Sequence, residues 1–226
     1  MTGALIVFAK PPTPGNVKTR LVSELSARDA AALYRAFLDD ALEQYAALSF
    51  DVRLYMAEPE DGDAGLDVLG SHHFEQEGSG LGERMHRAFA GTFGEGYDRA
   101  VIVGTDHPTL PTAFIEQAFD LLTAPQSIVI GPADDGGYYL LGMNDPRPEV
   151  FREMTYSHDR VFDETLDRAL ASGAFVSILP QWYDVDTPAD LRRLAAELSD
   201  GGAGVAPRTR RLLGKLAEHY AVLQRL

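Results

Sequence analysis

The chain has 226 residues, a length that suits one α/β domain and leaves little room for a second. It contains no cysteine, which excludes disulfides, cysteine nucleophiles and thiolate metal sites and is typical of a cytoplasmic protein. Its net charge of −14 argues against nucleic acid or an anionic membrane as a partner, and no apolar run reaches the roughly 18 residues of a membrane span.

Short apolar segments rich in β-branched residues alternate with longer amphipathic segments along the chain. The short segments predict strands over residues 4–9, 52–57, 100–104, 127–131, 138–143 and 175–179. The longer segments predict helices over residues 26–48, 81–93, 111–122, 160–171, 188–198 and 208–226. The alternation predicts an α/β fold with a mostly parallel sheet flanked by helices. A first strand so close to Met1 argues against a signal peptide.

The segment DGGAGVAP, residues 200–207, is predicted to be a linker. It would separate a catalytic domain over residues 1–199 from the C-terminal helix. That helix is expected to pack on the outside of the domain or to join two copies of the chain in a homodimer.

The loop after the first strand, KPPTPGNVKTR, gathers positive charge around the conformationally free Gly15. It carries Lys10, Lys18 and Arg20, and the whole chain has only three lysines. The spacing matches neither the Walker loop nor the glycine motif of dinucleotide-binding proteins. Because ligands of open parallel sheets bind beyond the carboxyl ends of the strands, we interpret this loop as a polyphosphate site. The alternative is a solvated surface loop.

Carboxylates follow two later strands. Asp106 comes directly after the strand at 100–104, and Asp184 and Asp186 precede the helix at 188–198. Mg²⁺ and Mn²⁺ prefer carboxylate and phosphate oxygens, so Asp106 and one of Asp184 and Asp186 are predicted to hold such a metal ion. The alternatives are structural: Asp106 caps the next turn, and one of Asp184 and Asp186 caps the helix.

The segment PADDGGYY lies between two predicted strands. Asp134, Asp135, Gly136 and Gly137 form either a simple turn or a clamp for a sugar or an acceptor, since glycines let the backbone approach a ligand closely.

Four sequence blocks resemble a known family. FAKPPTPGNVKTRL, VGTDHP, GPADDGGYYLLG and YDVDTPADL are similar to signature blocks of GT-A-like transferases described as radical-SAM- or selenodomain-associated, arsenosugar-biosynthesis glycosyltransferases. The resemblance covers residues 4–198. More distantly, the blocks are similar to 2-phospholactate guanylyltransferases and to molybdenum-cofactor and sugar nucleotidyltransferases. The resemblance implies a Rossmann-like GT-A fold with a divalent Mg or Mn ion.

The same resemblance implies roles for individual residues. It places Lys10, Lys18 and Arg20 at the donor phosphates, Asp106 and Asp186 at the metal, and Asp135, Gly136 and Gly137 toward the sugar or acceptor. A further block, QEGSGLGERM, makes Gln76 and Arg84 candidates for contact with the base or the phosphates. That block has Gly80 where the family has an aspartate. His107 stands where the family often has cysteine, and we interpret it as a tolerated substitution.

The block TYSHDR, residues 155–160, precedes a predicted helix. Ser157 is expected to cap that helix, and His158 is an alternative base for the acceptor. The predicted activity is glycosyl transfer from a nucleotide sugar to a small-molecule acceptor, with Asp135 or His158 activating the acceptor hydroxyl. The same residues would also suit a nucleotidyltransferase that uses an NTP and a phosphorylated acceptor. A nucleotide-binding protein without catalysis is the third alternative.

Overall fold

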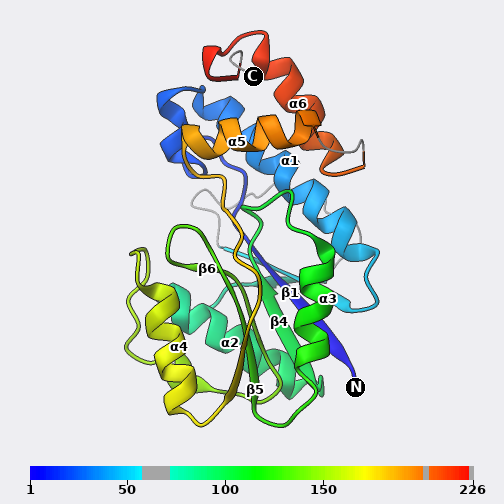
Figure 1. The fold of residues 1–226 in the computed structure, drawn as a ribbon, viewed down its shortest axis with the longest axis vertical. Helices are drawn as coiled ribbons and strands as arrows, with labels where there is room; N and C mark the ends of the chain where they lie inside the picture. Colours follow the sequence, from blue (N-terminus) through cyan, green and yellow to red (C-terminus); the bar gives the residue numbers. More distant parts are fainter. Residues whose placement is uncertain (58–71, 201–203, 224–226) are drawn as a thin grey trace.

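The computed structural model describes residues 1–57, 72–200 and 204–223. Its centre is a seven-stranded sheet in the order β3-β2-β1-β4-β6-β5-β7 (Figure 1). The strands are β1 (Gly3–Ala9), β2 (Asp51–Met56), β3 (His72–Glu75), β4 (Arg99–Val103), β5 (Ser127–Pro132), β6 (Tyr138–Met143) and β7 (Phe175–Ile178). Only β6 runs antiparallel to its neighbours within this sheet. The predicted α/β class with a mostly parallel mixed sheet is therefore confirmed.

Helices cover both faces of the sheet because strand residues alternate between the two faces. Leu5 and Val7 of β1 pack in one cluster with α1 (Ala27–Ala46) and α3 (Thr112–Leu121). Ile6, between them, packs on the other face with residues of α2 (Leu81–Gly94) and α4 (Val161–Ala171). At the start of α1, the side chain of Ser26 caps the helix by accepting a hydrogen bond from the backbone N–H of Asp29.

A third apolar cluster joins α1 to α5 (Pro188–Asp200) and α6 (Pro207–Ala217) at one end of the molecule (Figure 1). The buried carboxylate of Asp40 in α1 accepts hydrogen bonds from the backbone N–H groups of Arg208 and Thr209, in the first turn of α6. This contact satisfies helix-start donors that have no partner within the helix.

Among the described residues, the helices are too short or too polar for any of them to span a membrane.

The strand order reverses direction between β1 and β4. The chain proceeds from β1 outward through β2 to β3 and then crosses to β4 on the other side of β1. The loops after β1 and β4 therefore separate at the carboxyl edge, which is where open α/β sheets form their ligand crevices. Because β6 is antiparallel, the segment before it, residues 133–137, begins at this same edge.

The turn before β6 packs against the start of α4. Gly136 has φ +86° and accepts a hydrogen bond of 2.8 Å from the backbone N–H of Phe162. A Cβ atom at Gly136 would lie 2.1 Å from the carbonyl oxygen of Asp159. Both the backbone angle and the available space therefore require glycine at this position.

We predict that Gly136→Ala lowers the free energy of unfolding by about 1–3 kcal/mol more than Gly15→Ala, which is the range for overpacking. Gly15 is the matched control, because it also has a positive φ of +90° but a Cβ there would meet no atom within 4 Å. Urea denaturation of both variants measures the difference. Equal losses of stability would show that the close contact with Asp159 is relieved by a small backbone shift.

Candidate functional site

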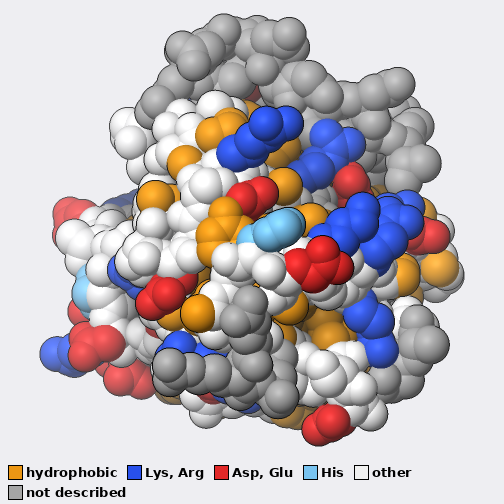
Figure 2. All heavy atoms as spheres, turned by 90° about the horizontal axis from the view of Figure 1, so that it is seen from above, with side chains coloured by type: hydrophobic (Ala, Val, Ile, Leu, Met, Phe, Trp, Pro, Cys, Tyr) orange, Lys and Arg blue, Asp and Glu red, His pale blue; other side chains and the backbone are white. Residues whose placement is uncertain are grey.

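A cavity of about 470 Å³ lies at the carboxyl edge of the sheet. Its walls come from the loops after β1, β4 and β7 and from the start of α2, and its polar lining includes Lys10, Lys18, Arg20, Gln76, Asp106, Asp184 and Asp186. Figure 2, which views the molecule from above, shows acidic and basic side chains interspersed on the end that lies at the top of Figure 1. The cavity therefore combines several cations and carboxylates at the place where this sheet topology forms ligand sites.

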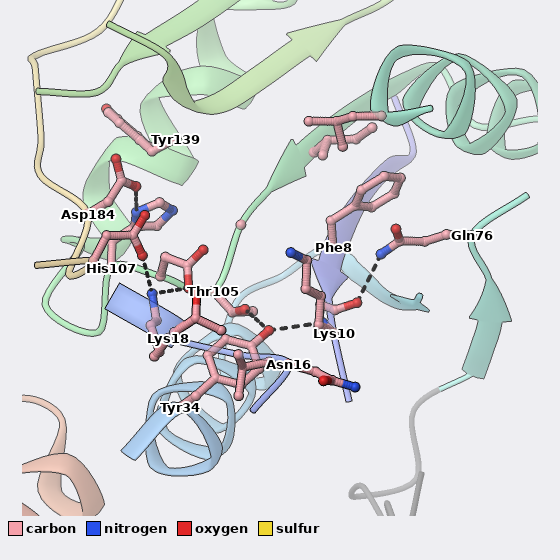
Figure 3. A pocket seen from close by; sticks show the side chains of 18 of the residues that line it. Phe8, Lys10, Asn16, Lys18, Tyr34, Gln76, Thr105, His107, Tyr139 and Asp184 are labelled. Atoms are coloured by element: carbon pink, nitrogen blue, oxygen red, sulfur yellow. Dashed lines mark hydrogen bonds and ion pairs between the residues drawn. The ribbon is translucent and has the colours of Figure 1, made fainter. Parts of the chain in front are cut away.

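Lys18 connects the two carboxylates that were predicted to bind a metal ion. Its Nζ atom forms ion pairs with Oδ1 of Asp106 and, at 2.9 Å, with Oδ1 of Asp186 (Figure 3). The Lys18 side chain is 3% exposed, whereas those of Asp106 and Asp186 are 44% and 42% exposed. The ammonium thus lies beneath two carboxylates that face the cavity.

These contacts fix the charge state of the cluster. Burial alone would lower the pKa of Lys18, but Asp106 and Asp186 raise it above the ordinary value for lysine. Burial would also raise the pKa of Asp106, but the ammonium of Lys18 lowers it below its ordinary value. Lys18 and Asp106 are therefore both charged at neutral pH.

The two carboxylates meet one requirement of a divalent metal site. Both place Oδ1 within ion-pair distance of one point, the Nζ atom of Lys18, and both supply the hard oxygen ligands that Mg²⁺ and Mn²⁺ prefer. No group of three acidic or histidine side chains able to hold a metal ion occurs among the described residues. A metal ion here would therefore need further oxygen ligands from a substrate phosphate or from water.

Tyr34 of α1 ties the first loop to the loop after β4. Its hydroxyl accepts a hydrogen bond of 2.9 Å from the backbone N–H of Lys10 and shares another of 2.9 Å with the hydroxyl of Thr105 (Figure 3). Burial raises the pKa of Tyr34 to about 12, so the hydroxyl keeps its proton. Sequence analysis did not identify this residue, because only the fold brings α1 beneath the two loops.

Gln76 has a defined orientation at the cavity wall. Its Nε2 atom donates to the backbone carbonyls of Ala9, at 3.0 Å, and Tyr55, at 2.8 Å. Both N–H groups are therefore engaged, and the side chain has only its carbonyl oxygen left to offer a ligand. An oxygen acceptor suits an N–H group of a nucleobase and does not suit a phosphate. Arg84, by contrast, donates to the carbonyl of Gly78 in the segment before α2 and does not line the cavity.

Asp184 and His107 form a pair that sequence analysis did not predict. Nδ1 of the buried His107 lies 2.7 Å from Oδ1 of Asp184, and the Asp184 side chain is 17% exposed at the cavity (Figure 3).

Neither Asp184 nor Asp186 caps α5. Thr187 and Asp190 do so instead, since the Asp190 carboxylate accepts from the Thr187 N–H at 2.7 Å and the Asp190 N–H donates to the Thr187 hydroxyl at 3.3 Å. The Thr-x-x-Asp spacing of Thr187 and Asp190 is the sequence pattern that indicates this cap.

The remaining predicted residues do not line the cavity: Gly15, Arg84, Asp134, Asp135, Gly136, Gly137 and His158. Asp134 forms an ion pair of 2.7 Å with Arg193, and Asp135 accepts from the N–H of Gly137. Nε2 of His158 contacts Thr155, and its Nδ1 accepts from the backbone N–H of Arg160, so both ring nitrogens serve the local turn.

The prediction that Ser157 caps α4 is wrong. Helix α4 begins after Arg160, and no side chain caps it. Ser157 instead takes a positive φ of 69° within the preceding turn.

The chain belongs to a family described as "Uncharacterized protein conserved in bacteria (DUF2064)", whose profile matches residues 31–158. A protein of Desulfovibrio desulfuricans G20, provisionally named a nucleotide-diphospho-sugar transferase, is 32% identical with a TM-score of 0.90, and the match covers 100% of this chain and 98% of that one. A cytidylyltransferase of Leptospira borgpetersenii serovar Hardjo-bovis (strain JB197) has a TM-score of 0.63 at 14% identity, covering 100% and 98% of the two chains. A search of curated proteins gives no match. The predicted Rossmann-like fold of nucleotide-diphospho-sugar transferases is therefore confirmed.

We predict that Tyr34→Phe lowers the free energy of unfolding by about 1–3 kcal/mol, because the buried hydroxyl of Thr105 and the backbone N–H of Lys10 lose their hydrogen-bond partner. Tyr45→Phe is the control. Tyr45 is a similarly buried tyrosine of α1, and its hydroxyl has no hydrogen bond among the contacts of the described residues. Denaturant unfolding of both variants measures the effect. A Tyr45→Phe loss as large as that of Tyr34→Phe would assign the effect to packing and not to the link between the loops.

Proposed function

We propose that this member of the DUF2064 family is a transferase that binds a nucleotide-diphospho-sugar in the cavity and transfers the sugar to a hydroxyl of a small acceptor. The observation that carries the proposal is the convergence of two carboxylates on one cation at the carboxyl edge, with two further cations, Lys10 and Arg20, in the same cavity. Polyphosphate donors need both kinds of group, cations for their charge and carboxylates for an associated metal ion. The name of the 32% identical protein from Desulfovibrio desulfuricans supports the same substrate class.

Different residues of the cavity are proposed to bind different parts of the donor. Lys10 and Arg20 are proposed to bind the diphosphate, and the carbonyl oxygen of Gln76 to accept a hydrogen bond from an N–H group of the base. Asp106 and Asp186 would hold a Mg or Mn ion. When bound, that ion supplies charge neutralisation for the diphosphate leaving group.

Asp184 replaces Asp135 and His158 as the group proposed to act on the acceptor. Asp135 and His158 do not line the cavity, whereas Asp184 does. Nδ1 of His107 lies 2.7 Å from one oxygen of Asp184, and this contact is proposed to orient the carboxylate. The carboxylate is then available to orient the acceptor hydroxyl and to take its proton. His107 acts through Asp184 and is a positioning residue.

The donor class is tested by a thermal-shift panel of nucleotide sugars and nucleoside triphosphates, each with and without Mg²⁺ or Mn²⁺. A ligand at about 100 times its Kd adds about 2.7 kcal/mol to the free energy of unfolding, so a millimolar ligand of modest affinity raises Tm measurably. We expect metal-dependent stabilisation by a nucleotide sugar, and loss of the metal dependence in Asp106→Asn. A preference for a triphosphate would instead indicate nucleotidyl transfer, and no response to any ligand would indicate a protein without this activity.

The role of Asp184 is tested by comparing Asp184→Asn with Asp134→Asn. Both substitutions remove one negative charge from neighbouring segments, but only Asp184 lines the cavity. With the donor that the panel identifies, we expect Asp184→Asn to lower kcat by about 100-fold or more, the range of general-base catalysis, with donor Kd unchanged. Asp134→Asn should retain kcat. Full activity of Asp184→Asn, or an equal loss in both variants, would reject the assignment.

A further inference from the structure

The ammonium of Lys18 occupies the position that a divalent ion would need. Asp106 and Asp186 direct Oδ1 at the same Nζ atom. A metal ion held by both of these oxygens would need the same position. An ammonium donates to carboxylates, whereas a metal ion accepts electron pairs from them, so the two cations compete for the same lone pairs.

Electrostatics prevent both cations from sharing the site. A doubly charged ion bound to either carboxylate would lie within a few ångströms of Nζ, and repulsion between charges is strong at such distances in a partly buried position. The aromatic rings of Tyr34 and Phe37 lie 5.8 and 5.7 Å from Nζ and form one side of its surroundings. A metal ion bound to both Oδ1 atoms therefore requires the ammonium to move away.

We propose that Lys18 is a resident counter-ion that excludes divalent metal from the ligand-free protein and is released toward the donor phosphates when donor and metal bind together. Lys18 directly precedes the short helix η1 (Thr19–Ser23) and follows Lys10 in the loop after β1. Its release would therefore move its charge within the phosphate-binding region of the cavity. The release rests on the proposed function, whereas the exclusion of metal rests only on the contacts of Lys18.

The exclusion predicts that the lysine weakens metal binding. Removal of a neighbouring cation should strengthen the binding of Mn²⁺ to Asp106 and Asp186, although the protein as a whole is already strongly acidic. Without Lys18, the two carboxylates would face each other with no counter-ion, and a metal ion would relieve their repulsion. Methionine is a suitable replacement, because it keeps an unbranched apolar stem against the two rings and removes only the charged end.

The experiment measures binding of Mn²⁺ alone to the full chain by electron paramagnetic resonance, for the wild type, Lys18→Met and Lys10→Met. Lys10 lines the same cavity and its loss changes the net charge equally, but it forms no ion pair with either carboxylate in the described structure. We expect Lys18→Met to lower the Kd for Mn²⁺ by about tenfold to 100-fold, the range for hydrogen bonds to charged groups, and Lys10→Met to change it by less than about threefold. In the double variant Lys18→Met/Asp106→Asn, the increase in Mn²⁺ affinity should be lost.

An unchanged or weaker affinity in Lys18→Met would overturn the proposal, as would an equal gain in Lys10→Met. Circular dichroism checks that each variant is folded, and Lys18→Gln carries the same expectation if Lys18→Met does not fold. Because the probe is the metal alone, the absence of nucleotide binding would reject the proposed function and leave this result intact. Conversely, an unchanged Mn²⁺ affinity would reject the exclusion even in a protein that binds nucleotides.

Discussion

The ion pairs of Lys18 are the interaction on which the candidate site depends. They join a residue of the first loop to one that follows β4 and one that precedes α5. A buried ammonium needs charged partners, so the three segments are held in one arrangement and not only in proximity. The backbone reinforces this link, since the N–H of Val185 donates to the carbonyl of Asp106 at 3.0 Å.

The sheet brings these segments together before any side chain contributes. β1 and β4 are adjacent and parallel, so the residues after them leave the sheet at the same edge. The reversal of strand order at β1 separates their loops, and Tyr34 then closes the base of the gap by binding both. Topology thus sets the place of the cavity, and a few buried polar contacts set its shape.

The sequence was sufficient to predict the fold class and the segments that form the cavity, because hydrophobic alternation locates strand ends and strand ends locate loops. It did not predict where side chains within those loops point. Lys18 was expected at a phosphate, yet it turns to carboxylates 88 and 168 positions away along the chain. The turn at 134–137 was expected at the cavity, yet Gly136 binds the start of α4. Such directions depend on tertiary contacts that no local pattern contains.

The charge of the cavity limits what it can bind. Lys18 is neutralised by Asp106 and Asp186, which leaves Lys10 and Arg20 as the cavity cations among the described residues without a carboxylate partner in an ion pair. With Lys18 included, the cavity lining has three cations and the three carboxylates of Asp106, Asp184 and Asp186, so it has no net positive formal charge to attract a diphosphate on its own. An anionic donor is therefore expected to bind together with a divalent cation, since that cation converts the carboxylates from a source of repulsion into ligands. In an acidic protein with only three lysines, the proposed metal ion and the proposed release of Lys18 would be two parts of one charge balance.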